Sequence, residues 1–198
     1  TDQYIQSSQK VGPSMADDIK NAAFLAVVFA MFCMAAYILL RFRDISFSVG
    51  AFASVAVTTL CIISFYTLLW KVLPFSMEVD QTFIAAILTI IGYSINDTVV
   101  VFDRIRETIG LYPKRDRYQV INDALNSTLS RTFNTSLTTL VVVLCIFILG
   151  GATIRSFTFA ILLGIIIGTY STLFVATPIA YELQKKKINK KAAAEAGK

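Results

Sequence analysis

Five apolar stretches, each long enough to cross a lipid bilayer, dominate the sequence. They lie at about 22–40, 47–69, 83–102, 133–149 and 157–181. A helix needs about 20 mostly apolar residues to span the hydrocarbon core, because each residue advances it by about 1.5 Å. Hydrophobic residues make up 56% of the chain and are gathered in these blocks, which excludes a soluble domain and a disordered chain. The sequence predicts an all-α polytopic membrane protein.

Lysines and arginines are distributed unevenly between the two sides that the five stretches define. One side holds Arg41, Arg43, Arg104, Arg106, Lys114, Arg115, Arg117, Arg131, Lys185, Lys186, Lys187, Lys190, Lys191 and Lys198, and the other holds Lys10, Lys20, Lys71 and Arg155. Loops rich in these residues stay in the cytoplasm, so we expect a cytoplasmic C-terminus and a periplasmic N-terminus. Residues 1–20 would then end a periplasmic segment, 21–182 form the transmembrane bundle, and 183–198 form a basic cytoplasmic tail. Because Thr1 stands in place of an initiator Met, we expect a piece of a longer protein.

The remaining composition argues against nucleic acid, metal and disulfide chemistry. The net charge of +5 comes from basic residues that flank apolar stretches, with no basic patch interleaved with aromatic residues. The chain has no histidine, and Cys33, Cys61 and Cys145 lie in apolar blocks without metal-ligand spacing. We therefore predict buried thiols, no metal site and no nucleic-acid partner.

Asp97 is a carboxylate inside the stretch 83–102, which holds no other charged residue. A charge at the bilayer centre costs about 2.5–3.5 kcal/mol, so such a residue usually pairs, titrates or lines a water-filled path. Tyr93 and Ser94, four and three positions earlier, share its helical face. Asp97 lies about 7 Å from Phe102 along the helix, in the predicted cytoplasmic half. We expect a functional site here, and a neutral Asp97 that only bonds a neighbouring helix is the alternative.

A second set of polar residues begins the fourth apolar stretch. Arg131, Asn134, Thr135 and Thr138 fall on one face at helical spacing. Arg131 has two interpretations: its side chain extends to lipid headgroups, or it pairs with Asp97 on the preceding antiparallel helix. In the second case Arg131 would favour the ionised carboxylate while removal from water opposed it.

The segment 103–132 is the longest polar stretch. Asp116 and Gln119 fit a helix capping box, and apolar residues then recur at helical spacing, which predicts a cytoplasmic amphipathic helix over about 117–130. Small residues also recur at helical spacing and predict close helix packing. They are Ala22, Ala26 and Ala30 in the first stretch, Gly50, Ser54 and Thr58 in the second, and Gly164, Gly168, Thr172 and Ala176 in the last.

Several of these motifs match one family. Residues 92–107 read GYSINDTVVVFDRIRE, 11–14 read VGPS, 73–80 read LPFSMEVD, and Gly150-Gly151 follows the fourth stretch. This pattern resembles the SecF family of protein-export membrane proteins, from the resistance-nodulation-division superfamily. The resemblance covers nearly the whole chain. It implies five helices of a six-helix bundle in the bacterial cytoplasmic (inner) membrane, from a separate SecF or a fused SecDF, without the first helix and the periplasmic head.

The resemblance also implies a function, which is ion-driven assistance to late protein export without covalent catalysis. Asp97, Arg131 and Thr135 match the family's ion-conducting residues; the coupling ion would be H+, or Na+ in some members, and no other cofactor is implied. We class Tyr93, Ser94, Asn134 and Thr138 as supporting polar residues. The implied partners are a SecD half or subunit, the SecYEG channel, YajC, an unfolded preprotein and membrane lipids.

Other functions remain as alternatives. A small-molecule or lipid exporter half of the same superfamily would share the Asp97 site but would need large twin periplasmic loops. A passive membrane scaffold would not need Asp97 to titrate. An intramembrane aspartyl protease needs two facing carboxylates, and this chain has one deep Asp.

Overall fold

The computed structural model describes residues 13–73, 75, 77 and 80–196, and side chains between residues 21 and 190 with the same gaps. The described elements are all helical. They are α1 (Pro13–Phe42), α2 (Ile45–Leu69), α3 (Gln81–Leu111), α4 (Arg117–Leu149), α5 (Ala152–Ser171), a π-helical turn η2 (Thr172–Ala176) and α6 (Thr177–Ala196). Within these residues, five helical stretches are long and apolar enough to cross a membrane, the last running from Ala152 to Lys190. The predicted all-α polytopic membrane fold is confirmed.

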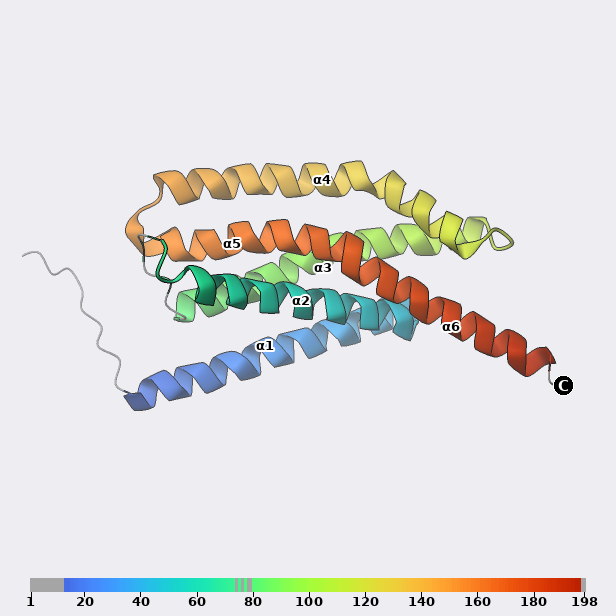
Figure 1. The fold of residues 1–198 in the computed structure, drawn as a ribbon, viewed down its shortest axis with the longest axis horizontal. Helices are drawn as coiled ribbons and strands as arrows, with labels where there is room; N and C mark the ends of the chain where they lie inside the picture. Colours follow the sequence, from blue (N-terminus) through green and yellow to red (C-terminus); the bar gives the residue numbers. More distant parts are fainter. Residues whose placement is uncertain (1–12, 74, 76, 78–79, 197–198) are drawn as a thin grey trace, which may run out of the picture.

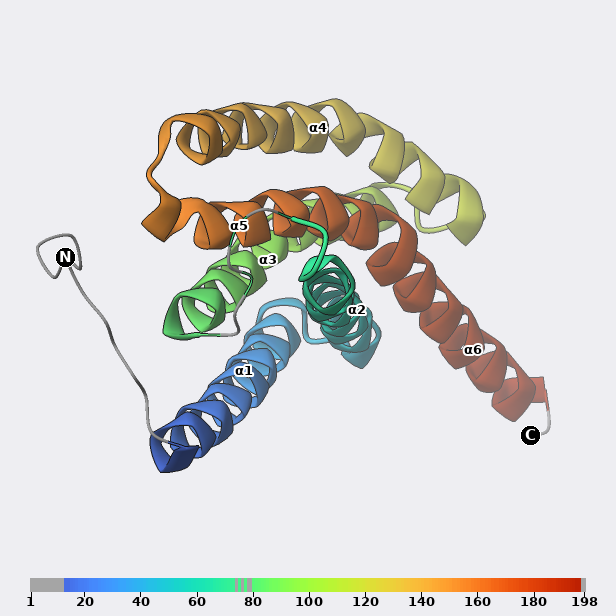
Figure 2. The ribbon, with the colours of Figure 1, turned by 60° about the vertical axis from the view of Figure 1, so that its left-hand side comes forward.

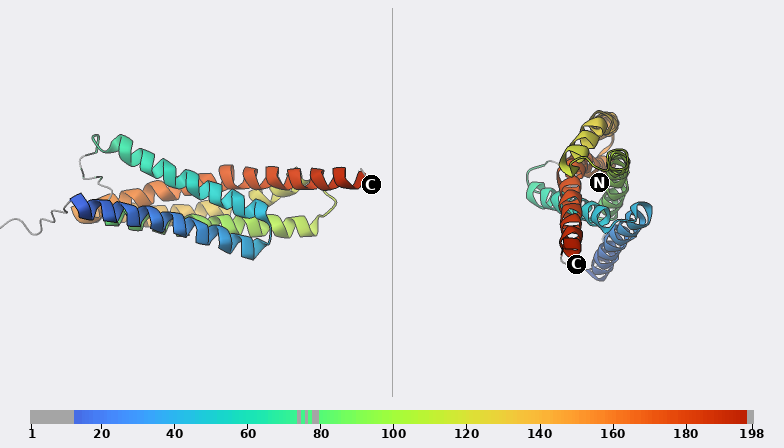
Figure 3. Two further views of the ribbon diagram at one scale, coloured as in Figure 1. Left: turned by 90° about the horizontal axis from the view of Figure 1, so that it is seen from below. Right: turned by 90° about the vertical axis from the view of Figure 1, so that its right-hand side faces the viewer.

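The helices run along one long axis around a central α3 (Figure 1). α3 contacts α1, α2, α4, α5 and η2, whereas α1 contacts mainly α2 and α3. The α1–α2 turn, the α3–α4 loop and α6 lie at one end, seen on the right of Figure 1 and in the left view of Figure 3. This end carries most of the lysines and arginines, and we call it the basic end.

Aspartates begin three of the helices. The carboxylates of Asp44, Asp80 and Asp116 accept hydrogen bonds from the backbone N–H groups of Ser46, Phe83 and Gln119. Each satisfies a free N–H of the first turn and places negative charge at the positive end of the helix dipole. The predicted helix start at Asp116 is confirmed.

Two apolar clusters lie at opposite ends of the bundle. Phe42, Phe47 and Phe102 pack together near the basic end, with ring centroids 4.8–6.0 Å apart. At the other end Tyr66 packs on Phe83, with centroids 4.4 Å apart. Hydroxyl-bearing residues and Asp97 lie between the two clusters. We call this set the polar layer, and it comprises Ser54, Ser94, Asp97, Thr98, Ser136, Thr169, Ser171 and Thr172.

The predicted close helix packing occurs at two of the three sets of small residues, those of the second and the last apolar stretch. A Cβ built on Gly164 of α5 would lie 2.4 Å from the Ile90 side chain of α3, and one on Gly50 of α2 would lie 2.5 Å from the Ala176 carbonyl oxygen. Only hydrogen fits at these positions. The prediction fails at Ala22, which is exposed because α1 lies at the edge of the bundle.

Several boundaries differ from the predicted ones. The predicted amphipathic helix and the fourth stretch form one continuous helix, α4. The last stretch begins earlier, at Ala152, and continues as helix through the basic segment to Ala196. α1 begins at Pro13, inside the segment assigned to the periplasm, and residues 1–12 lie outside the described part. The side chains of 191–198 are likewise outside it.

The prediction of buried thiols is wrong for two cysteines. Cys33 and Cys145 are exposed on the outside of the bundle, and Cys61 is half-buried. In a membrane bundle the apolar faces of the outer helices point toward lipid as well as toward the core, so residence in an apolar stretch does not imply burial.

The π-helical turn precedes Pro178, which lacks the N–H that a regular helix would bond to the carbonyl of Phe174. Across the turn, the Thr177 hydroxyl donates to the carbonyl of Thr172, five residues back, at 3.2 Å. Beyond this break, α6 extends away from the bundle and diverges from the rest of the basic end (Figure 2). Proline and π-turns are established causes of such breaks.

Candidate functional site: a carboxyl in a polar layer

Asp97 lies within α3 with 4% of its surface exposed. The Ser136 hydroxyl of α4 donates to Asp97 Oδ2 at 3.4 Å, and Ser136 Oγ is also 2.7 Å from Thr169 Oγ1 of α5. One carboxyl and two hydroxyls therefore join three membrane-spanning helices. A hydroxyl can donate or accept, so this connection can form with either protonation state of the carboxyl.

The next residue, Thr98, extends the polar layer toward η2. Its hydroxyl donates to the Ser94 carbonyl at 2.9 Å and lies 3.0 Å from Thr172 Oγ1. Ser54 Oγ of α2 donates to Ser171 Oγ at 3.1 Å. The polar layer thus connects α4, α3, α5 and α2. The two apolar clusters lie on either side of it along the bundle.

Two buried hydroxyls, one within the polar layer and one outside its defined set, lack partners. Among the described residues, Ser94 Oγ and Thr132 Oγ1 are the buried side-chain atoms with no hydrogen bond. Ser94 faces Gly168 of α5, where an added Cβ would lie 3.4 Å from its oxygen. A buried hydroxyl without a hydrogen-bond partner costs free energy. These two hydroxyls can regain it by bonding a water molecule or a neighbouring residue that has rearranged.

The predicted stripe on α4 points outward instead of toward Asp97. Arg131, Asn134 and Thr138 are exposed, and Thr135 is half-buried. The Thr135 hydroxyl donates to the Arg131 carbonyl at 2.9 Å, and that of Thr138 to the Asn134 carbonyl at 2.9 Å. No ion pair within 4.0 Å joins Arg131 and Asp97 in the described structure. Their pairing stays a prediction.

Tyr93 connects α3 to this stripe. Its hydroxyl donates to the Thr135 carbonyl at 3.4 Å and to Thr139 Oγ1 at 3.3 Å. Ser94, the other predicted neighbour of Asp97, is buried but makes no side-chain bond to it.

The sequence pattern does not single out Ser136, Thr169 or Thr98. Ser136 directly follows Thr135, and about 100° of rotation separates consecutive residues on a helix, so Ser136 faces inward where its neighbour does not. The helical spacing of polar residues identifies which of them share a face of the helix, but it does not identify which face meets the neighbouring helix.

Comparison with known proteins identifies the family. Residues 1–186 match the model described as "Protein export membrane protein SecD/SecF, C-terminal". Protein translocase subunit SecF of Rhodothermus marinus is 48% identical over 176 residues, and that of Petrotoga mobilis is 40% identical over 183 residues. The matches cover 89% and 92% of this chain but 57% and 58% of those relatives, so the chain spans less than two thirds of their length.

Solved structures give the same result at the level of the fold. The crystal structure of SecDF in its Super-membrane-facing form matches with a TM-score of 0.79 and 36% identity, over 94% of this chain and 24% of that one. SecDF from Thermus thermophilus, described as a translocon-associated membrane protein, matches with a TM-score of 0.78 and 39% identity, over 88% of this chain and 23% of that one. This multi-pass membrane chain therefore belongs to the SecD/SecF C-terminal family of protein-export membrane proteins.

Proposed function

We propose that this chain is the membrane part of an accessory subunit of the Sec protein translocase, which uses an ion gradient to assist late export of an unfolded preprotein through SecYEG. Family membership supports the export function, since the relatives are protein translocase subunits. We place the subunit in the bacterial cytoplasmic membrane with the basic end in the cytoplasm. Its role is mechanical coupling without covalent catalysis, with SecD, SecYEG and YajC as partners.

The observation that carries the ion-coupling proposal is Asp97, buried in the polar layer between two apolar clusters. Proton uptake turns an acceptor-only carboxylate into a group that also donates. The Ser136 hydroxyl, which donates to the ionised carboxylate, can then accept a hydrogen bond from the protonated carboxyl and donate to Thr169, which lies within 2.7 Å. Binding and release of H+, with Na+ as the alternative ion, would thereby alter the contacts between α3, α4 and α5.

Exposed polar faces on α3 and α4 support contact with a SecD half. On α3 the exposed residues Thr89, Gly92 and Asn96 recur at helical spacing, and on α4 Arg131, Asn134 and Thr138 do the same. Tyr93 lies beside the first group and Thr135 beside the second, and the bond between them places the two faces next to each other. Polar residues at this depth avoid lipid and usually meet another helix. Arg131 would then serve the ion site from this shared interface.

The first test replaces the titrating group in the full-length protein. Asp97→Asn keeps side-chain volume and hydrogen bonding but cannot release a proton, so we expect it to abolish ion-dependent stimulation of export while SecD still copurifies. Asp103→Asn is the matched control, because Asp103 is on the same helix but exposed and paired with Arg41 at 3.2 Å. Wild-type stimulation in Asp97→Asn membranes would favour a passive scaffold.

The second test concerns the partner face. A photo-crosslinking amino acid at Asn96 should form a covalent adduct with SecD in membranes, whereas one at Phe65, an exposed residue of α2, should not. Adducts to lipid alone at Asn96 would contradict the assignment of this face to SecD.

A further inference from the structure

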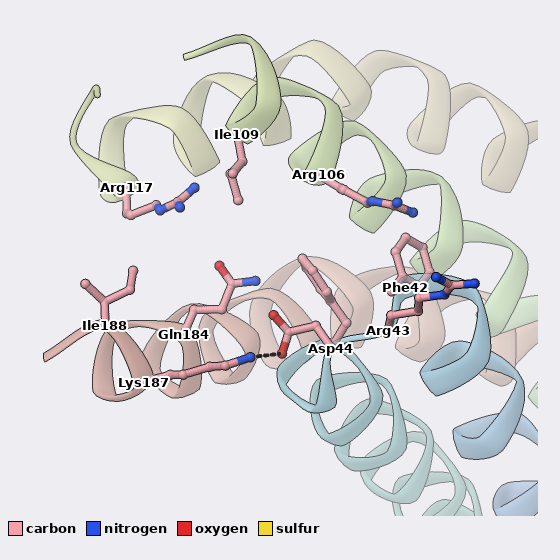
Figure 4. A pocket seen from close by; sticks show the side chains of 10 residues that line it. Phe42, Arg43, Asp44, Arg106, Ile109, Arg117, Gln184, Lys187 and Ile188 are labelled. Carbon is pink, nitrogen blue, oxygen red and sulfur yellow. Dashed lines mark hydrogen bonds and ion pairs between the residues drawn. The ribbon is translucent and has the colours of Figure 1, made fainter. Parts of the chain in front are cut away.

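A cavity of about 340 Å³ opens at the basic end, apart from the polar layer. The α1–α2 turn, the end of α3, the start of α4 and α6 surround it (Figure 4). Arg43 and Asp44 come from the turn, Arg106 from α3, Arg117 from α4, and Lys187 from α6. Four basic side chains and one carboxylate thus line one hollow, which carries an excess of positive charge.

The arginines of this cavity differ from Arg41, Arg104 and Arg115 at the same end, which are paired with carboxylates. Four basic residues here have carboxylate partners. The pairs are Arg41–Asp103, Arg104–Glu107, Arg115–Asp123 and Lys187–Asp44, at 2.7–3.4 Å. Among the side chains that the structure describes, Arg43, Arg106 and Arg117 have no such partner, and all three line the cavity. The Arg106 guanidinium donates only to the backbone carbonyl of Arg41, at 3.4 Å.

The backbone fixes where two of these arginines stand. Arg43 takes a left-handed conformation with φ of 53°, and its N–H donates to the Leu39 carbonyl at 2.8 Å, which ends α1. Asp44 then caps α2, so its carboxylate is held both by the helix start and by Lys187. Arg117 is the first residue of α4 and is half-buried. The Asp44 carboxylate of the cavity is therefore already paired, whereas its three arginines have no carboxylate partner among the described side chains.

The cavity also has an apolar wall. Phe42 and Phe47 are 5% and 4% exposed and belong to the apolar cluster of the basic end, Ile109 is partly buried and packs against the same cluster, and Ile188 is exposed. Phe42 is the last residue of the first membrane span. Arg41 and Arg43 flank Phe42 at the end of this apolar stretch, and such charged ends of membrane helices favour the depth of lipid headgroups.

We infer that this cavity binds the phosphate of an anionic phospholipid headgroup. Guanidinium groups match phosphate oxygens with paired, charge-assisted hydrogen bonds, and three of them without carboxylates leave a site for one or two negative charges. Basic hollows between helices on the cytoplasmic side are suited to anionic lipid headgroups. The apolar wall and the interfacial depth favour a lipid over free phosphate, which shares the same chemistry. The site depends on neither ion coupling nor export.

The test compares lipid retention between two triple variants of the full-length protein in nanodiscs made of equal parts phosphatidylglycerol and phosphatidylcholine. Arg43→Gln, Arg106→Gln and Arg117→Gln together remove the cavity cations. Arg41→Gln, Arg104→Gln and Arg115→Gln together remove the same charge from the paired arginines of the same end. Native mass spectrometry after detergent extraction should find phosphatidylglycerol retained by the wild type and the paired-arginine variant, and reduced about tenfold in the cavity variant.

Two outcomes would overturn the proposal. Equal retention in the two triple variants, or equal loss, would show that the cavity is not the site. Displacement of phosphatidylglycerol by millimolar inorganic phosphate would assign the site to a soluble anion, provided that phosphate alone raises the unfolding temperature as much as phosphatidylglycerol does. If the cavity triple variant fails to fold by circular dichroism, Arg106→Gln alone is compared with Arg104→Gln, and the same difference in retained lipid is required.

Discussion

At the scale of residues, the notable feature of Asp97 is that its nearest polar partner is a hydroxyl and not a cation. A fixed cation would hold the carboxylate in one protonation state, whereas the Ser136 hydroxyl can rotate between Asp97 and Thr169. The carboxyl can therefore gain or lose a proton while every atom of this group keeps a partner. That property suits a group that must change state repeatedly within a membrane.

Ser136→Ala tests this contact. We expect ion-dependent export to fall by a factor of about 2 to 13, because a net hydrogen bond to a buried group is worth about 0.5–1.5 kcal/mol. Ser64→Ala is the control, since Ser64 is exposed and bonds only the Leu60 carbonyl of its own helix. An unchanged ion dependence in Ser136→Ala, measured in membrane vesicles, would remove Ser136 from the mechanism.

The sequence was sufficient to find Asp97, because a lone carboxylate in an apolar stretch needs no neighbour to be recognised. It was insufficient for the residues around Asp97. The spacing of Arg131, Thr135 and Thr138 places them on one face, but only tertiary packing decides that Ser136 turns inward. In water the polar face of a helix is the outer one, and within a bilayer that rule no longer selects a side.

At the scale of elements, the distance between α3 and α5 depends on one missing side chain. Gly164 of α5 packs directly against Ile90 of α3. One helical turn further along the same pair of helices, Gly168 packs against Ser94 of the polar layer. The close approach that Gly164 permits is what brings α5 hydroxyls within reach of α3.

Gly164→Ala should therefore destabilise the protein despite the better helix propensity of alanine. Overpacking costs about 1–3 kcal/mol, which exceeds the gain of about 1 kcal/mol expected for alanine over glycine in a helix. Gly110→Ala has open space around its Cβ and should be neutral or stabilising. Thermal unfolding in detergent checks both, and a Gly164→Ala midpoint at or above that of Gly110→Ala would contradict the packing argument.

Helix positions were predictable from the sequence, while the ends of the last helical stretch were not. Asp116 correctly marked the start of α4, and the apolar run lies within that helix. No glycine or proline lies between the two parts, so nothing ends the helix where its surroundings change from polar to apolar. Pro178 is a sequence signal for the break before α6, whereas the contact between the Thr172 and Thr98 hydroxyls, 3.0 Å apart, could only be seen in the structure.

At the scale of the whole molecule, the uneven distribution of basic residues predicts how the bundle is oriented. The α3–α4 loop and α6 lie at the basic end, and Lys71, which follows α2, lies at the other. Charge on these loops would have to cross the membrane if the bundle were inverted.

Thiol labelling in intact cells measures the orientation. In a background without Cys33, Cys61 and Cys145, the Lys71→Cys variant should react with an impermeant reagent, and Lys114→Cys should react only after the membrane is permeabilised. The reverse pattern would invert the assignment and would move the arginine cavity to the outer leaflet.

The break before Pro178 gives the molecule a lever. α6 is about 30 Å long, and Lys187 lies about 14 Å beyond the proline. A rotation of only about 10° at η2 would carry Lys187 through about 2 Å and the far end of α6 through about 5 Å. Thr172, whose hydroxyl contacts that of Thr98, is part of η2, about which this rotation would take place. A rotation at this contact would therefore displace the far end of α6 more than the residues of η2 themselves.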